Sequence, residues 1–451
     1  MAERRPKTER SVKGLEATRR IWPATKAYKV EMEEHRKKGG LIAWNGGDTA
    51  SLELLYAFDI LPQHIDSMAT NFSAKQVSED FILRAEEWGF PRDFCTYYKT
   101  VYGYLLAPLE QYPQIQAIAW PKPDLLVGGN SVCLTHPHGI QSLQKHFNVP
   151  AFVFDTPHPA YRMDEHEVGD DESPYVHPFI GASYQHELEE QYLDYGLRQQ
   201  KRYIEFLEGV TGKKLDMGKL KECVRLSKYT SELSIEIDRL RHNIPSPIGG
   251  ADIMSLMLVQ FLWAGSPRGI DILEQAIKEA KEKVARGEGA LPEEKYRIFF
   301  EGLPPWYSLG LFNYMQNLGA VSAIEAYPLN WTFEHLDPDH PLESLVRKRF
   351  SCLYTYSIKE RGDLFIRRMK EYKIDGIVIW SDICCKQIGF FAEYIRERAE
   401  KELGIPSVVL DADQCDTRDY NERVVKERID AFFELLDTRK KKAEERASEA
   451  R

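Results

Sequence analysis

Several signatures of common protein classes are missing from this sequence. No apolar run approaches the ~18 residues of a membrane span, and the basic segment 1–14 lacks the apolar stretch of a secretory signal. There is no CxxC pair typical of zinc knuckles and no Walker A motif for ATP hydrolysis. A net charge of −10 disfavours binding to nucleic-acid phosphates. We therefore expect a cytoplasmic protein that binds neither membrane nor nucleic acid and does not hydrolyse ATP itself.

The chain nevertheless contains 7 cysteines. Disulfides are rare in the cytoplasm, so these residues are expected to be buried hydrophobic side chains, reactive thiols or metal ligands. Without a CxxC pair, any metal site must gather its ligands from distant segments.

The order of expected elements predicts an α/β fold with two lobes. At 451 residues the chain is too long for one hydrophobic core. Short apolar segments alternate with helical patterns in two regions, which predicts short parallel sheets flanked by helices. The region between them has a helical period and no convincing strand. We expect a helical arm (1–38), a first lobe (39–174), a helical insert (175–290), a second lobe (291–438) and a charged tail (439–451).

Two cysteines lie where open α/β sheets usually build their sites. Cys133 follows an expected strand at 124–127, and Cys385 follows another at 376–380, each at the start of a helix. Cys95 precedes a further helix. Helix N-termini stabilise thiolates, although free cysteines are also among the most buried residues. Three thiolates would leave one iron of a cluster open to water or substrate. From the residues alone, both a metal site and a structural role stay open.

Other candidate residues lie beside these cysteines and near the first strand. His136 and His138 follow Cys133 closely, and either is a candidate proton donor, a support for a metal ligand, or a surface residue. The turn at 45–49 contains two glycines and leads into a helix. It could hold a phosphate, but a tight strand-to-helix turn is the more general explanation.

These residues resemble the 2-hydroxyacyl-CoA dehydratase / benzoyl-CoA reductase family. The resemblance extends from about residue 40 to 438 and is greatest to the B-type, cluster-bearing subunit of ATP-dependent benzoyl-CoA reductase. The matching segments are 93–99 around Cys95, Cys133 after its strand, 245–248, 292–297 leading to 301–302, 375–376 before the strand that ends near Cys385, and 428–433. Their order and spacing carry more weight than any single segment.

The resemblance implies a [4Fe–4S] cluster held by Cys95, Cys133 and Cys385. It also implies a homologous second cluster-binding subunit and separate ATP-hydrolysing [4Fe–4S] activator subunits, which ferredoxin would reduce. The implied reaction is low-potential electron transfer to an aromatic acyl-CoA, giving a cyclic dienoyl-CoA. The alternative is dehydration of a 2-hydroxyacyl-CoA through a ketyl radical to an enoyl-CoA. A scaffold or electron-relay subunit, whose partner holds the substrate, is a third possibility.

Overall fold

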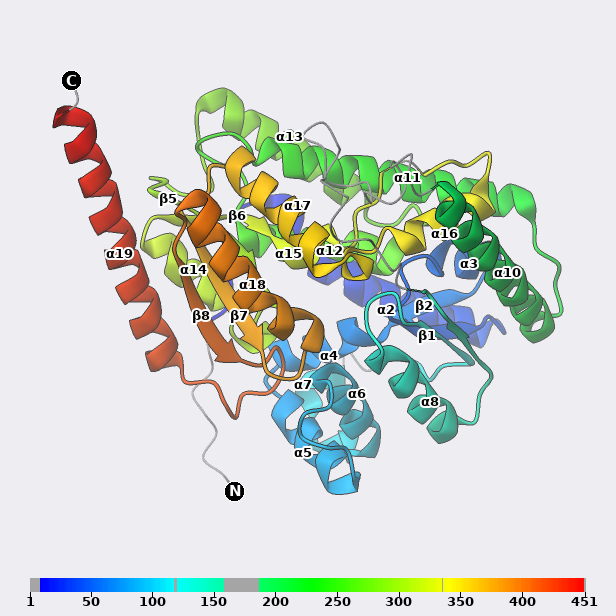
Figure 1. The fold of residues 1–451 in the computed structure, drawn as a ribbon. Coiled ribbons are helices and arrows are strands. Elements are labelled where there is room, and N and C mark those ends of the chain that lie inside the picture. The colour runs from blue at the N-terminus through cyan, green and yellow to red at the C-terminus, as the bar shows by residue number, and fades with distance from the viewer. Residues whose placement is uncertain (1–8, 117–119, 158–185, 335, 450–451) are drawn as a thin grey trace.

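Two four-stranded parallel sheets form the framework of the molecule (Figure 1). The computed structural model describes residues 9–116, 120–157, 186–334 and 336–449. The first sheet has the order β2-β1-β3-β4 and the second the order β6-β5-β7-β8. The strands are β1 (Ile42–Gly46), β2 (Leu61–His64), β3 (Leu125–Gly129), β4 (Ala151–Phe154), β5 (Tyr296–Glu301), β6 (Ala320–Glu325), β7 (Gly376–Asp382) and β8 (Ser407–Ala412). The predicted two-lobed α/β fold with parallel sheets is confirmed.

Both sheets have the same strand order relative to the chain. In each lobe the first strand pairs with the second on one side and with the third on the other. After the second strand, the chain therefore crosses back over the first strand and adds the third strand on its other side. In such sheets a crevice opens beyond the carboxyl ends of the two central strands, where ligands usually bind. The segments that carry Cys133 and Cys385 follow β3 and β7 at these positions.

Helices cover the sheets of both lobes. Those of the first lobe and the N-terminal arm are α1 (Glu16–Arg19), α2 (Ile21–Lys37), α3 (Leu52–Ala57), α4 (Ile65–Ala74), α5 (Ser78–Trp88), α6 (Thr96–Leu106), α7 (Pro113–Gln116) and α8 (Thr135–Phe147). Those of the second lobe are α14 (Gly310–Asn317), α15 (Ala326–Leu329), α16 (Pro341–Phe350), α17 (Ile358–Glu371), α18 (Lys386–Leu403) and α19 (Glu422–Glu449). Single 3₁₀ turns are η1 (Leu109–Gln111), η3 (Trp306–Ser308) and η4 (Leu353–Thr355). None of the described helices is both long enough and apolar enough to cross a membrane.

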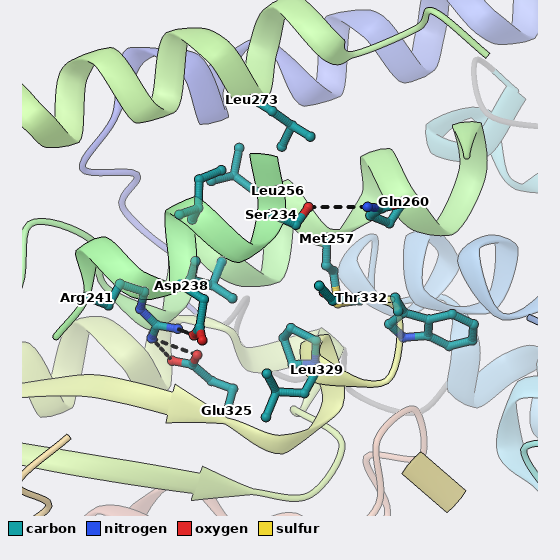
Figure 2. A pocket seen from close by; sticks show the side chains of 14 residues that line it. Ser234, Asp238, Arg241, Leu256, Met257, Gln260, Leu273, Glu325, Leu329 and Thr332 are labelled. Carbon is teal, nitrogen blue, oxygen red and sulfur yellow. Dashed lines mark hydrogen bonds and ion pairs between the residues drawn. The ribbon is translucent and has the colours of Figure 1, made fainter. Parts of the chain in front are cut away.

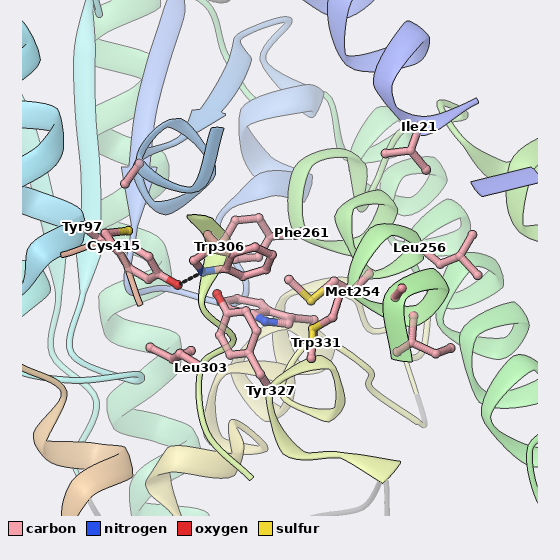
Figure 3. Close-up of a cluster of buried hydrophobic side chains, with 14 of the residues drawn as sticks. Ile21, Tyr97, Met254, Leu256, Phe261, Leu303, Trp306, Tyr327, Trp331 and Cys415 are labelled. Atoms are coloured by element: carbon pink, nitrogen blue, oxygen red, sulfur yellow. Dashed lines mark hydrogen bonds between the residues drawn. The ribbon is translucent and has the colours of Figure 1, made fainter. Parts of the chain in front are cut away.

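Four long helices join the two lobes, namely α10 (His186–Thr211), α11 (Met217–Leu240), α12 (Gly250–Trp263) and α13 (Ile270–Arg286). Almost every residue of α12 is buried, which agrees with its apolar side chains on all faces. It contacts α11, α13, β2 and β6, so it lies between elements of both lobes. The largest group of buried hydrophobic side chains surrounds it (Figure 3). The two sheets are therefore held in position by one shared core.

The structure differs from the sequence-based expectation in two places. The segment Leu61–His64 forms β2, a strand that the apolar pattern does not predict because only Leu61 and Pro62 are apolar. The charged tail expected from residue 439 is exposed, but it continues α19 as helix to Glu449.

Candidate functional site

Three cysteine thiols lie at the N-terminal ends of helices. Cys95 is the N-cap residue of α6, Cys385 is that of α18, and Cys133 lies two residues before α8. Backbone N–H groups donate hydrogen bonds to each sulfur, from Tyr97 to Cys95, from Thr135 and His136 to Cys133, and from Gln387 and Ile388 to Cys385. These N–H groups carry the partial positive charge of a helix N-terminus, which stabilises a thiolate or a bound anionic group.

The fold brings the three thiols together from two lobes. Cys95 interacts electrostatically with Cys133 and with Cys385, and Cys385 interacts with Cys133. Burial raises the pKa of the Cys133 thiol, and it raises those of Cys95 and Cys385 well above their ordinary value. A thiol in this environment ionises readily only when a cation such as iron takes the place of its proton.

The three thiols are not arranged around a single metal ion. Among the described residues, no group of three His, Cys, Asp or Glu side chains is arranged to hold one ion. Cysteines that bind a cluster contact different iron atoms and are accordingly spread more widely. Three half-buried, interacting thiols at helix N-termini therefore fit a cluster of several irons.

A row of three buried polar side chains lies beside the thiols. The Tyr98 hydroxyl is 3.0 Å from Nδ1 of His136, and Nε2 of His136 is 3.9 Å from a carboxyl oxygen of Asp66. Asp66 also interacts electrostatically with Cys95 and Cys133. Burial raises the pKa of Asp66 to about 8 and lowers the pKa of His136 to about 3. At neutral pH the pair is a protonated acid beside a neutral imidazole, and not a salt bridge.

Glycines at the end of β1 leave room for the side chains of Tyr98 and His136. A Cβ atom at Gly46 would lie 2.9 Å from the Tyr98 hydroxyl and 3.2 Å from Nδ1 of His136. At the next position, Gly47 has a φ of 71°, and a Cβ there would lie 2.4 Å from the carbonyl oxygen of Gly129. The glycines of the 45–49 turn thus allow close packing against β3, which favours the tight-turn interpretation over a phosphate cradle.

The two histidines proposed as proton donors have different environments. His136 is 4% exposed and lies in the polar row, whereas His138 is exposed on α8. The structure therefore brings His136 to the thiols and leaves His138 at the surface.

The other four cysteines have ordinary structural surroundings. Cys384 is half-buried, and its thiol donates to the backbone carbonyl of Arg92 at 3.5 Å. Cys352 donates to the side-chain oxygen of Asn330 at 3.1 Å. Cys223 and Cys415 are buried among hydrophobic side chains.

Sequence reasoning missed Asp66 and His64, which lie at the start of α4 and on the unpredicted strand β2. Both are buried, at 4% and 2% exposure. A polar signal was present, because His64 and Asp66 directly precede the apolar helical pattern of Met68, Ala69 and Phe72. That signal indicates a helix start, and it does not reveal that the polar groups are buried.

Aromatic side chains form a wall that begins at Tyr97, and Figure 3 shows its members Trp306, Tyr327 and Trp331. The indole N–H of Trp306 donates to the hydroxyl of Tyr97 at 2.6 Å, two residues after Cys95. The ring of Trp306 contacts Tyr327 edge to face, and Tyr327 contacts Trp331 in the same way. Tyr327 also interacts electrostatically with Cys385 and Asp66. Trp306 is thus part of a packed, water-excluding wall.

A pocket lies between α11, α12, α13 and the segment after β6 (Figure 2). None of the three converging cysteines lines it. Its walls are mainly apolar, and Asp238, Arg241 and Glu325 lie together at one end. Arg241 and Glu325 form a buried ion pair of 2.7 Å. Trp331 lines the pocket, and its ring also contacts Phe261 and His64, which ends β2.

Comparison with known proteins identifies the family of this chain. The family model described as 2-hydroxyglutaryl-CoA dehydratase, D-component, matches residues 49–436. The chain is similar to the B subunit of benzoyl-CoA reductase from Thauera aromatica, with 26% identity over 86% of this chain and 87% of the relative. It is similar to the alpha subunit of (R)-2-hydroxyisocaproyl-CoA dehydratase of Clostridioides difficile, with 23% identity over 90% and 92% of the two chains. It is also similar to the alpha subunit of lactoyl-CoA dehydratase of Anaerotignum propionicum, with 23% identity over 92% and 95%. Because the model spans most of its length, the chain belongs to the family described as 2-hydroxyglutaryl-CoA dehydratase, D-component, whose members include subunits of acyl-CoA dehydratases and of a benzoyl-CoA reductase.

Proposed function

We propose that this protein is the [4Fe–4S]-binding catalytic subunit of an ATP-dependent benzoyl-CoA reductase. Cys95, Cys133 and Cys385 would hold the cluster, and the remaining iron would be open to substrate or water. The observation that supports the proposal is the meeting of three half-buried thiols, from two lobes, at three helix N-termini. A cluster bound there would supply low-potential electrons for an aromatic acyl-CoA.

The protein's own residues would exclude water and hold a proton. The aromatic wall of Tyr97, Trp306 and Tyr327 keeps solvent from the side of the thiols that it covers. Asp66 holds a proton at neutral pH because burial raises its pKa to about 8. We assign the proton donor role to Asp66, and we place His136 between Asp66 and Tyr98 as a relay.

A 2-hydroxyacyl-CoA dehydratase subunit is the second candidate. The family model and two of the three similar proteins named above carry dehydratase names. Both reactions would use the same thiols and the same buried acid. They differ in electron balance, because the reductase consumes electrons and the dehydratase has no net redox change.

The proposal includes partners. The similar proteins are named as alpha or B subunits, which supports a hetero-oligomer with a homologous second cluster-binding subunit. ATP-hydrolysing [4Fe–4S] activator subunits, reduced by ferredoxin, would supply the electrons.

The test is an anaerobic assay of the complex with its activator, ATP and a low-potential donor. We expect iron, sulfide and a reduced-cluster EPR signal, with benzoyl-CoA converted to a dienoyl-CoA as electrons are consumed. An enoyl-CoA formed from a 2-hydroxyacyl-CoA without electron consumption would select the dehydratase.

The cluster ligands are tested by a pair of neighbouring substitutions. Cys385→Ala should abolish iron binding and the EPR signal. Cys384→Ala should retain both, because the Cys384 thiol bonds to a backbone carbonyl and not to the other thiols. Equal iron content in the two variants would refute the assigned ligand set.

The relay is tested by a second pair. His136→Phe should lower kcat by about 10²-fold while cluster content stays constant, because general acid–base groups typically contribute about 10²–10⁴-fold. His138→Ala, at an exposed position on the same helix, should leave kcat unchanged. A loss of activity confined to the His138 variant would reverse the assignment.

A further inference from the structure

The imidazole of His64 is held rigidly at the carboxyl end of β2. It is the last residue of the strand and the N-cap of α4. Its ring lies 3.8 Å from the ring of Phe261, centroid to centroid, and meets Trp331 edge to face at 5.9 Å. These contacts come from α12 and from the segment after β6 and fix the plane of the imidazole.

The hydrogen bonding of His64 defines its tautomer. The backbone N–H of Asp66 donates to Nδ1 of His64 at 3.3 Å. A neutral imidazole that accepts at Nδ1 carries its proton on Nε2. Burial, with a smaller contribution from the neighbouring ring of His136, lowers the pKa of His64 well below its usual value and so maintains the neutral form. Nε2 is therefore a hydrogen-bond donor at any physiological pH.

This donor lacks a partner within the described part of the chain, and so do groups around it. Nε2 of His64 is buried without a hydrogen bond to any described residue. The same holds for both side-chain amide atoms of Asn45, which is the register partner of His64 on β1. One oxygen of Asp66 is also buried without a partner among these residues. A buried donor that makes no hydrogen bond costs about 1–3 kcal/mol, so several together at one sheet edge indicate a site for an external polar group.

The position of these groups points to the reacting end of a substrate. They lie at the carboxyl edge of the first sheet, the same edge from which the chain runs to Cys133. Asp66, two residues after His64, interacts electrostatically with Cys95 and Cys133. The ligand must therefore present a hydrogen-bond acceptor close to the thiols, and a thioester carbonyl oxygen is such an acceptor.

We propose that Nε2–H of His64 and the side-chain amide of Asn45 donate hydrogen bonds to the carbonyl oxygen of the bound acyl-CoA thioester. This assignment rests on the proposed function only in taking an acyl-CoA as the ligand. The contact forms and breaks no covalent bond. Two neutral donors, fixed before the ligand binds, polarise the carbonyl and stabilise negative charge that develops on its oxygen.

The test compares a thioester with its carbonyl-free analogue. The probes are benzoyl-CoA and S-benzyl-CoA, in which a methylene replaces the carbonyl, titrated into the anaerobic complex. His64→Leu should weaken benzoyl-CoA binding about tenfold, the loss of one hydrogen bond, and change S-benzyl-CoA binding less than about twofold. His64→Gln, whose amide can donate from a similar position, should restore part of the difference. Asn45→Ala removes the second donor independently. It should likewise weaken the binding of benzoyl-CoA more than that of S-benzyl-CoA.

The possible outcomes separate the two proposals. If the His64 and Asn45 variants retain iron but bind both probes equally more weakly than the wild type, the two residues have a structural role. That result would overturn the assignment. If the wild type binds neither benzoyl probe, isocaproyl-CoA and S-(4-methylpentyl)-CoA provide the same comparison for an aliphatic acyl group. A wild type that binds neither thioester overturns the proposed function together with the assignment, whereas a wild type that binds the thioester and its analogue equally overturns the assignment alone.

Discussion

Replacing Asp66 with asparagine should stabilise the folded protein while removing its proton donor. Asp66 is 4% exposed, and among the described residues its only ion-pair partner is the imidazole of His136. Burial lowers the pKa of His136 to about 3, so this partner provides no positive charge at neutral pH. The carboxyl is therefore buried without compensation, and its pKa rises from 3.8 to about 8.

The sign and size of the effect follow from this raised pKa. In the unfolded chain Asp66 loses its proton near pH 4, whereas in the folded chain it keeps the proton up to about pH 8. Folding thus requires proton uptake between these values, and the contribution of Asp66 becomes less favourable as pH rises through this window. At about 1.36 kcal/mol per pH unit, the cost is about 1.5 kcal/mol at pH 5 and about 4 kcal/mol at pH 7.

The measurement is denaturant unfolding of the anaerobically purified protein at both pH values. Asp66→Asn should raise the free energy of unfolding relative to the wild type at pH 7 and do so much less at pH 5. Asp411→Asn, at an exposed carboxylate on β8, controls for the change of net charge and should give the same small difference at both pH values. A gain from Asp66→Asn that is independent of pH, or a loss at pH 7, would refute the reasoning. Such a stabilised, inactive variant would be an instance of the usual conflict between stability and activity at a functional site.

Two further predictions concern the pocket and the turn after β1. Arg241→Met should destabilise the fold by about 3–5 kcal/mol, because it leaves the Glu325 carboxylate buried and unpaired. Arg396→Met, which breaks an exposed pair, should not shift the unfolding midpoint, and similar midpoints for the two variants would contradict the role of burial. Gly47→Ala should lower the thermal unfolding midpoint far more than Gly39→Ala. Both glycines have positive φ, but only at Gly47 would the added Cβ meet backbone, so equal effects would show that dihedral strain alone decides the cost.

The parts of the fold that sequence predicts are those whose signal is local. Seven of the eight strands coincide with short apolar segments, and the bounds of β3 and β7 lie within two residues of the expected strands at 124–127 and 376–380. Cysteines after β3 and β7 could be placed at one edge of each sheet by the general behaviour of parallel sheets. The interaction between Cys133 and Cys385 is then the structural consequence of two lobes whose sites face each other.

The polar part of the site could not be predicted because it depends on distant segments. β2 has few apolar residues, since His64 and Gln63 are buried by packing and not by their own hydrophobicity. His64 is covered by Phe261 and Trp331, which follow it by about 200 residues or more. The shifted pKa of Asp66 likewise follows from burial, which no local pattern reports. His138 lies two residues after His136 and is exposed, so residue type and proximity to a cysteine did not distinguish the two histidines.

The two lobes use equivalent positions in opposite ways, and this difference indicates where the ligand binds. His64 ends β2 and caps α4, and Glu325 ends β6 and caps α15, so both residues lie at the same point of the same topology. Glu325 is neutralised by Arg241 within the protein. His64 has no partner for Nε2 in the described chain, and the acid Asp66 beside it has no cationic partner there. The paired carboxylate of Glu325 thus contributes to the structure of the second lobe. The unpaired neutral donor of His64, at the matching position of the first lobe, is available to a ligand. The first lobe, which also contributes Cys95 and Cys133, is therefore the lobe that we expect to hold the reacting end of the substrate, and the second lobe completes the site with Cys385.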